Sequence, residues 1–440
     1  MNIWNIIIRH DESDDFSVNS SEDERNLVFP INTISGESDF LSTNVFSELL
    51  ASNILPKNNS FDLLNLGLCV YTIDQIISRT RYGYQGWSRH LKVYIPVNDV
   101  EVWNTVIEDL QTLLSFLSGD KWEFFFRQVK EIRNVTSLSQ TNTQNFDTVS
   151  LFSGGLDSYI EAINLLEEKK KVIFVSHYKS GSESPTQTEL YNGLKEKYGE
   201  SSFSKYKFWV QPNQKNLAVS KEDTSRARSF LFLTLGLTIA NSLGDDITFI
   251  VPENGLISLN IPLTGTRLSS HSTRTTHPFY LDTFKKVLRT IGIKNPISNP
   301  FQFDTKGEMM INCKNPDFLK STYGKTLSCS HPDNSRFTKG QKPGIHCGYC
   351  VPCIIRKASE KKFNASETKY APKIIDVLKK SGRDIRAFKL SIERMSDYSR
   401  HKLILEILKS GPLPFDDKKE LDNYLALYER GMEEVADYLK

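Results

Sequence analysis

One stretch, VSLFSGGLDSYIEAINLL at residues 149–166, constrains the fold more than any other part of this 440-residue chain. Its first residues are apolar and favour a strand, and apolar residues recur at helical spacing after the two glycines. The stretch therefore predicts a strand that runs directly into a helix. Two consecutive glycines let the connecting turn adopt positive φ and bring its backbone close to a ligand.

This turn predicts an anion-binding site. Successive N–H groups at a helix start form a concave nest of partial positive charge that suits a phosphate or pyrophosphate. Asp157 would repel bare phosphates, so its carboxylate is expected to hold Mg²⁺ bound to them. The alternative is a helix start capped by a small polar residue, but the position after the first strand of an α/β unit favours binding. The nest is assigned to Ser153, Gly154, Gly155, Leu156, Asp157 and Ser158.

The residues around this turn alternate between strand and helix patterns. Strands are expected at 149–152, 172–176, 207–210 and 247–251, and helices after the turn, near 186–198 and through SFLFLTLGLTIANSLG. This alternation predicts an α/β fold with a doubly wound parallel sheet. Ligands of such sheets bind beyond the carboxyl ends of the strands, where the strand order reverses, and the Ser/Gly turn is expected at such an end.

Three domains are predicted along the chain. Residues 1–133 are interpreted as an α+β domain, residues 133–148 as a polar linker, residues 148–360 as the nucleotide-binding domain, and residues 361–440 as a C-terminal helical extension. In the first domain, strands are expected in NIWNIIIRH, at 90–97 and at 122–129, with a helix through 102–117. In the last domain, helices are expected in APKIIDVLKKSG, in SRHKLILEILKSG and at 418–440.

A cluster of cysteines predicts a metal centre. Cys329, Cys347, Cys350 and Cys353 follow the spacing C-x17-C-x2-C-x2-C, and four thiolates so placed can close a tetrahedral structural site. Zinc is favoured over an iron–sulfur cluster because no neighbouring motif indicates redox chemistry.

Other residues near the cluster allow several roles. His346 adjoins a ligand and could compete for the metal. Arg356 and Lys357 could offset thiolate charge, reach an anionic substrate, or form a solvated basic face. Cys69 and Cys313 stand apart in the sequence and are expected to be buried as small apolar residues.

Composition limits the partners. The chain has 55 basic and 53 acidic residues and a net charge of +2, which gives no electrostatic case for wrapping nucleic acid. Nucleic acid is therefore not expected as a direct substrate. The N-terminal segment lacks the basic region of a secretory signal, and no apolar run approaches the roughly 20 residues of a spanning helix. A cytoplasmic location without a membrane partner is expected.

The nest motif resembles the loop of the N-type ATP pyrophosphatases, the PP-loop enzymes of the adenine nucleotide alpha hydrolase-like fold. In that group the loop binds the pyrophosphate that leaves when ATP adenylates a substrate oxygen. With the cysteine cluster, residues 148–360 resemble the QueC family of 7-cyano-7-deazaguanine synthases. The matching segments are SGGLDS, Arg228 opening a long helix, TKGEM with Lys306 and Glu308, and CGYCVPCIIR with Arg356. The additions at both ends are similar to those of the QueC-like subunits of the Qat antiphage systems.

The resemblance implies ATP, Mg²⁺ and Zn²⁺ as cofactors, with Asp157, Arg228 and Lys306 as catalytic residues. Arg228 is followed by Ser where the family has Asn. The family's base-binding segment is replaced by VPENGLISLNIPLTGTRLSSHSTRTTHP. In this segment, Glu253 and Asn254 are expected to hydrogen-bond a guanine-like edge, whereas Arg267 and Arg274 are expected to meet an anion.

The implied reaction is adenylation of a carboxylate on a 7-deazaguanine-type substrate, followed by attack of an amine to give an amide or a nitrile. In an antiphage defence relative, the amine could belong to a partner protein of the same operon. Two alternatives remain open. One is a PP-loop tRNA-modifying enzyme, which the near-neutral charge disfavours. The other is a non-catalytic ATP-binding scaffold of a defence complex, which the altered base-binding segment favours.

Overall fold

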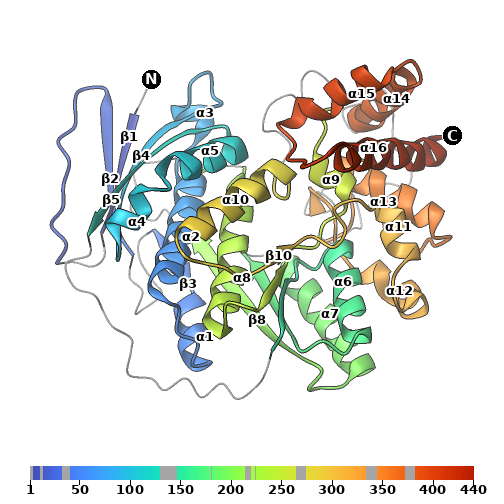
Figure 1. Cartoon of the computed structure of the whole chain (residues 1–440), viewed down its shortest axis with the longest axis horizontal. Helices are drawn as coiled ribbons and strands as arrows, with labels where there is room; N and C mark the ends of the chain where they lie inside the picture. The colour runs from blue at the N-terminus through green and yellow to red at the C-terminus, as the bar shows by residue number, and fades with distance from the viewer. Residues whose placement is uncertain are drawn as a thin grey trace.

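The computed structural model describes residues 3–9, 13–31, 40–128, 146–179, 181–213, 220–222, 224–263, 274–332, 344–371 and 382–440. Two β-sheets follow one another along the long axis of the molecule, and the C-terminal helices lie at the end opposite the first sheet (Figure 1).

Parallel pairing dominates both sheets. The first sheet has the strand order β2-β1-β4-β5, and the second has the order β10-β9-β6-β7-β8-β3. Every pair is parallel except β3 with β8. The strands are β1 (Ile3–Arg9), β2 (Glu24–Pro30), β3 (Leu41–Thr43), β4 (His90–Val97), β5 (Lys121–Gln128), β6 (Thr148–Leu151), β7 (Val172–Tyr178), β8 (Phe203–Pro212), β9 (Thr248–Ile250) and β10 (Ile297–Ser298).

The second sheet confirms the predicted α/β architecture with a parallel sheet. The chain moves outward from β6 through β7 to β8, and it then returns to the other side of β6 to form β9 and β10. The strand order therefore reverses between β6 and β9. The Ser/Gly turn follows β6, and Glu253 and Asn254 follow β9, so these residues share the carboxyl edge where ligands of such sheets bind.

Residues 1–133, for which an α+β domain is expected, contain a sheet of parallel strands. All pairs of this four-stranded sheet are parallel, which requires crossover connections in place of hairpins. The chain has room for such crossovers because helices fill the interval between β2 and β4. In addition, β3 lies within these residues but belongs to the second sheet, where it pairs with β8.

Helices connect the strands of both sheets and form the C-terminal part of the chain. They are α1 (Val45–Ala51), α2 (Asn58–Ile76), α3 (Arg79–Tyr82), α4 (Val100–Asn104), α5 (Ile107–Ser118), α6 (Leu156–Glu167), α7 (Glu183–Tyr198), α8 (Arg228–Leu243), α9 (Gly255–Leu259), α10 (Pro278–Thr290), α11 (Lys306–Ile311), α12 (Pro316–Thr322), α13 (Val351–Lys362), α14 (Arg383–Met395), α15 (Arg400–Ile407) and α16 (Lys418–Leu439). The helix expected through 102–117 is divided into α4 and α5. The segment APKIIDVLKKSG lies almost wholly outside the described residues.

Helix α2 is buried on every side. Sixteen of its 19 residues are buried, and apolar residues occur around its whole circumference. It packs so closely on α8 that a Cβ at Gly67 would lie 2.1 Å from Thr234 Oγ1. One hydrophobic cluster consequently runs from the first sheet through α2 to the second sheet. The expected boundary at residue 133 therefore does not separate two hydrophobic cores.

A buried network of charges joins α2 to the segment before α8. It contains three basic and three acidic side chains, Arg79, Arg89, Arg226, Asp74, Asp120 and Glu222. Both aspartates accept hydrogen bonds from the guanidinium groups of Arg79 and Arg89, at 2.5 to 2.9 Å. Asp74 Oδ2 also accepts the backbone N–H of Ala227 at 3.0 Å, directly before α8. The first 133 residues thus help to fix where α8 begins.

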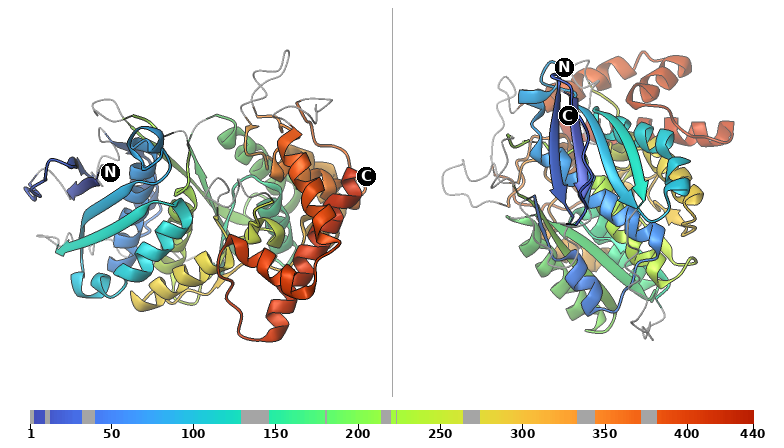
Figure 2. Two further views of the ribbon diagram at one scale, coloured as in Figure 1. Left: turned by 90° about the horizontal axis from the view of Figure 1, so that it is seen from above. Right: turned by 90° about the vertical axis from the view of Figure 1, so that its left-hand side faces the viewer.

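The C-terminal helices pack on one another and on α9 and α13. Helix α16 contacts α9, α13, α14 and α15, and their apolar side chains form one cluster. Figure 2 shows these helices lying along one side of the second sheet's region. Within the described ranges, no helix is both long and apolar enough to cross a membrane.

We expect Asp120→Asn to lower the free energy of unfolding by about 3–5 kcal/mol, because it leaves the buried network with one positive charge that no carboxylate balances. Burial opposes ionisation of Asp120, but the charges of Arg89 and Arg79 lower its pKa. Urea denaturation checks the prediction. The control is Asp245→Asn, which breaks the exposed ion pair with Lys57 and should cost less than about 1 kcal/mol. Equal losses in the two variants would contradict the assigned role of the network.

Candidate nucleotide site and metal centre

The Ser/Gly turn between β6 and α6 leaves the start of a helix without a side-chain cap. Gly154 has a φ of +85°, and a Cβ there would lie 3.2 Å from Gln187 Cγ. Gly155 is the N-cap of α6 and has no side chain to accept the first N–H groups. The positive φ expected of this double-glycine turn is therefore found at Gly154.

Hydroxyl oxygens accept the first N–H groups of the nest. The N–H of Gly155 donates to Ser153 Oγ at 3.2 Å, and the N–H of Leu156 donates to Ser328 Oγ at 3.0 Å. Ser153 Oγ also lies 3.1 Å from Ser158 Oγ. An oxygen atom with partial negative charge therefore lies at each N–H group, as an oxygen of a bound phosphate would.

Asp157 is the charged centre of the site. Its buried Oδ2 accepts the backbone N–H of Asn254 at 3.1 Å and the Nδ2–H of the same residue at 2.8 Å. Lys306 Nζ lies 2.7 Å from Oδ1. Burial opposes ionisation, but the charge of Lys306 and the hydrogen bonds lower the pKa of Asp157 to about 2. Asp157 is therefore a carboxylate at neutral pH.

Glu253 places a second carboxyl group beside the first. Burial and the charge of Asp157 raise the pKa of Glu253 well above its usual value. Asn254 Nδ2 contacts both carboxyl groups, since it also lies 3.2 Å from Glu253 Oε1. Asp157, Lys306, Glu253 and Asn254, all expected from the sequence to be site residues, thus meet at the point where the strand order reverses.

The two carboxyl groups fit a divalent cation. Among the described residues, Asp157 Oδ1 receives no hydrogen bond of normal geometry, although the ammonium of Lys306 is adjacent. A cation bound here would also favour ionisation of Glu253, because its charge would balance the second carboxylate. Carboxylate oxygens are the ligands that Mg²⁺ prefers.

Lys306 begins α11, and the C-terminal helix α16 fixes this start. Thr305 caps α11 in a capping box with Glu308. Glu434 of α16 accepts the hydroxyl hydrogen of Thr305 at 2.7 Å, and Arg430 of α16 binds Glu308 at 2.8 Å. Glu434 was not predicted as a site residue, because the sequence of an amphipathic helix does not indicate which group one of its acidic residues contacts.

Arg228 opens α8, and its charge is already paired. Its Nη1 donates to Glu183 Oε1 at 2.5 Å, and its Nε donates to His177 Nδ1 at 3.2 Å. Gln187 links this pair to the nest, because its Nε2 donates to the carbonyl oxygens of Ser153 and His177 at 3.3 and 3.2 Å. The structure therefore places Arg228 one layer of side chains behind the nest and outside the carboxylate site.

The two arginines expected to meet an anion are not brought to the nest. Arg274 lies 4.3 Å from the ring centroid of Phe116, and its Nη1 donates to the carbonyl oxygen of Phe116 at 3.1 Å. These contacts hold Arg274 against α5, so they do not support the expected anion contact. Arg267 lies outside the described residues.

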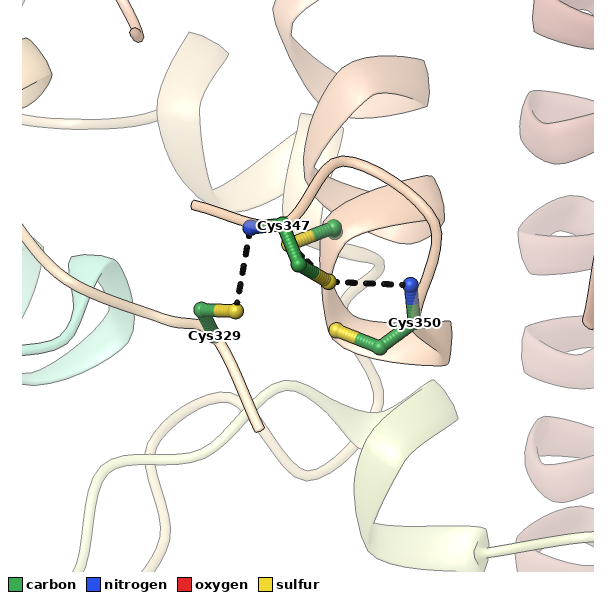
Figure 3. Close-up of side chains that lie close together, drawn as sticks. Cys329, Cys347 and Cys350 are labelled. Atoms are coloured by element: carbon green, nitrogen blue, oxygen red, sulfur yellow. Dashed lines mark hydrogen bonds between the residues drawn. The ribbon is translucent and has the colours of Figure 1, made fainter. Parts of the chain in front are cut away.

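The four cysteines form one cluster (Figure 3). Their sulfur atoms lie within 4.8 Å of one another, and the Sγ atoms of Cys347 and Cys353 are 3.9 Å apart. With Zn–S bonds near 2.3 Å, sulfur atoms at two corners of a tetrahedron are about 3.8 Å apart. Cys329 Sγ accepts the N–H of Cys347 at 3.3 Å, and Cys347 Sγ accepts the N–H of Cys350 at 3.4 Å. The cluster can therefore hold a metal ion such as zinc.

Thiolate formation is favoured at two of these cysteines, Cys329 and Cys347, whose pKa values are lowered. Hydrogen bonds from the other thiols, with that of Cys329 the largest contribution, lower the pKa of Cys347. The remaining two cysteines of the chain, Cys69 and Cys313, are buried and free, which confirms their expected burial.

His346 faces the nest side of the cluster. Its Nε2 accepts the backbone N–H of Ser328 at 3.1 Å, so this nitrogen is not offered to a metal. Burial and the charge of Arg356 lower the pKa of His346 to about 2, and its ring is therefore neutral.

Arg356 and Lys357 do not form a solvated basic face. Arg356 is fully buried, where it donates to Thr326 Oγ1 at 2.8 Å and pairs with Glu360 at 2.9 Å. Lys357 Nζ lies 4.4 Å from the ring centroid of Tyr370, beside the cysteine cluster. Its positive charge can offset thiolate charge there.

No protein-family model matches the chain, and no curated protein matches it. The assignment of function therefore depends on the geometry of the site.

We expect Cys347→Ser to abolish metal binding, because three thiolates no longer close a four-coordinate site. Elemental analysis of the purified protein should find about one zinc per wild-type chain and almost none in the variant. Cys313→Ser changes a buried cysteine outside the cluster and should retain the metal. Retention of a full equivalent by Cys347→Ser would refute the assigned ligand set.

We expect Glu253→Gln to remove a loss of stability at alkaline pH. Because the folded state holds the Glu253 proton and the unfolded state releases it near pH 4.5, stability falls as pH rises from that value towards the raised pKa of the folded state. The variant should gain about 1 kcal/mol or more at pH 8 relative to pH 5, measured by urea denaturation.

Glu429→Gln is the matched control for this change, because Glu429 is exposed on α16 and should leave the pH dependence unaltered. An identical pH profile for Glu253→Gln and the wild type would argue against a protonated Glu253.

Proposed function

We propose that the chain is an ATP-dependent C–N ligase that adenylates a carboxylate of a 7-deazaguanine-type substrate. The observation that carries this proposal is the meeting of the Ser153–Ser158 nest with the buried carboxylate of Asp157 and the ammonium of Lys306 at the reversal of strand order. This arrangement offers N–H donors, a cation and metal-binding oxygens on one edge of the sheet, which is what a triphosphate requires.

In the proposed first step, a carboxylate oxygen of the substrate attacks the α-phosphorus of ATP, and pyrophosphate leaves with the bonding electron pair. The products are an acyl adenylate and pyrophosphate. The positive end of α6, together with the hydroxyls of Ser153 and Ser328 that lie on its first N–H groups, would stabilise the charge that develops on the leaving group. Lys306 would supply a cation beside Asp157 without any rearrangement, since α11 and α16 already hold it.

Two metals would support this chemistry in different ways. Mg²⁺, held by Asp157 and Glu253, would neutralise phosphate charge when bound. Zinc, held by the four cysteines, would be structural, because four protein ligands leave no open position for a substrate.

In the proposed second step, the nitrogen of an amine attacks the acyl carbon, AMP leaves, and the nitrogen loses a proton to give an amide. With ammonia as the amine, the amide oxygen could attack a second ATP with loss of pyrophosphate and one N–H proton, and loss of AMP and the other N–H proton would then give a nitrile. With an amine of a partner protein, the product would remain attached to that protein. The resemblance to QueC-like subunits of Qat systems supports a role for this reaction in antiphage defence.

A non-catalytic ATP-binding scaffold is the second candidate. One observation favours it, namely that the charge of Arg228 is paired with Glu183 and is not directed to the nest. In a scaffold, nucleotide would stabilise an assembly without being consumed.

We expect the wild-type protein to exchange labelled pyrophosphate into ATP only when the correct carboxylate is present, so the assay should be run across 7-deazaguanine carboxylates and common metabolite carboxylates. Asp157→Asn should reduce the exchange rate by at least about 10²-fold, because it removes charge at the site of phosphate and metal binding.

Asp317→Asn is the matched control, because Asp317 is also in the first turn of a helix but is exposed. It should leave the exchange unchanged. ATP binding without exchange for any carboxylate would favour the scaffold, and absence of ATP binding would refute both candidates.

A further inference from the structure

The cysteine cluster and the nest are joined by residues adjacent to the metal ligands. Ser328 directly precedes Cys329, and His346 directly precedes Cys347. Arg356 lies one helical turn after Cys353, near the start of α13. The same short segments therefore carry both the sulfur ligands and the groups that contact the nest.

Ser328 lies where these segments meet the first turn of α6. Its Oγ accepts the N–H of Leu156 at 3.0 Å and the Nη1–H of Arg356 at 3.4 Å. Its backbone N–H donates to His346 Nε2 at 3.1 Å, and the neighbouring N–H of Leu327 donates to the carbonyl oxygen of Gly154 at 2.9 Å. Leu327 N–H and the Ser328 hydroxyl are therefore bonded to the nest, whereas the Ser328 N–H is bonded to His346 beside the cysteine cluster.

The hydroxyl of Ser328 still has a hydrogen to donate. A serine hydroxyl offers one donor and two acceptor positions, and the two N–H groups fill the acceptor positions. Among the residues that the structure describes, none accepts the Ser328 hydroxyl hydrogen. The adjacent guanidinium of Arg356 polarises this O–H towards a negatively charged acceptor. A phosphate oxygen beside the first turn of α6 would be such an acceptor.

We propose that the metal-loaded cysteine cluster is part of the nucleotide site, because it fixes Ser328 as a phosphate-contacting residue of the nest. This inference rests on the proposed function, since it assumes that the nest binds the pyrophosphate of ATP. It adds a binding residue outside the SGGLDS motif, and it makes nucleotide affinity depend on occupancy of the metal site.

The coupling has a physical basis in the short connections. Without metal, the four thiols lose their common centre, and the segments that precede Cys329 and Cys347 are held together only by hydrogen bonds. The Ser328 hydroxyl then spends less time at the nest. By thermodynamic linkage, pyrophosphate must stabilise the loaded cluster by the same factor by which the metal tightens pyrophosphate binding.

The first test is calorimetric titration of zinc-loaded protein with inorganic pyrophosphate and Mg²⁺. Ser328→Ala should weaken binding by about tenfold, because a hydrogen bond to a charged group is lost. Ser321→Ala, an exposed serine of α12, should bind as the wild type does. Wild-type affinity or tighter binding for Ser328→Ala would overturn the assignment, because the hydroxyl would then be neutral or a competitor.

The second test keeps the metal site loaded and therefore does not depend on the folding of metal-free protein. In protein substituted with Co²⁺, pyrophosphate should shift the absorption bands of the tetrahedral cobalt–thiolate site in the wild type. In Ser328→Ala, the shift should be strongly reduced. An unchanged wild-type spectrum at saturating pyrophosphate would overturn the coupling between cluster and nest.

These outcomes are distinct from failure of the proposed function. If folded, zinc-loaded wild-type protein binds neither pyrophosphate nor ATP, the nest assignment fails and the coupling fails with it. If the wild type binds and exchanges pyrophosphate but neither Ser328→Ala nor the cobalt spectrum responds, only the further inference fails.

Discussion

A carboxylate as deeply buried as that of Asp157 is costly unless N–H groups or cations compensate its charge. Asn254 supplies the N–H groups from the end of β9, and Lys306 supplies the cation from the start of α11. The first turn of α6 can therefore reach its observed place only when both of these segments are in position. This one charge links two neighbouring strands, a short helix and, through Glu434, the C-terminal helix.

Much of the second sheet could be predicted because four of its six strands, β6, β7, β8 and β9, carry a local signal, whereas the short strands β3 and β10 do not. The apolar runs at 172–176 and 247–251 and the double glycine after β6 indicate strands and a turn without reference to distant residues. Residues 1–133 carry weaker local signals. Helix α2 is apolar around its whole circumference, so it shows none of the periodicity by which helices are recognised in a sequence. Its contacts on both sides also determine that the two sheets share one core, which no local pattern records.

Some residues of the candidate site could be predicted from the sequence, and others could not. The four cysteines stand in a motif whose spacing indicates metal binding, Asp157 follows the double-glycine turn, and Lys306 was expected only from the resemblance to the QueC family. The residues that position them have no such signal. No sequence pattern indicates that Ser328 contacts α6 or that Glu434 contacts the start of α11. Arg228 shows the opposite case. Its place at a helix start was predicted, but its pairing with Glu183 depends on where α7 begins, which the sequence does not indicate.

The capping of α11 by Glu434 has a consequence for translation. Residues 148–362 contain the nest, the cysteines and Lys306 itself, and they leave the ribosome before α16 has been made. Until Glu434 emerges, Thr305 lacks its distant acceptor, and only the capping box and the ion pair with Asp157 hold the start of α11. A nascent chain that stops before α16 would thus carry every motif of the site without the contacts that Glu434 and Arg430 add to α11.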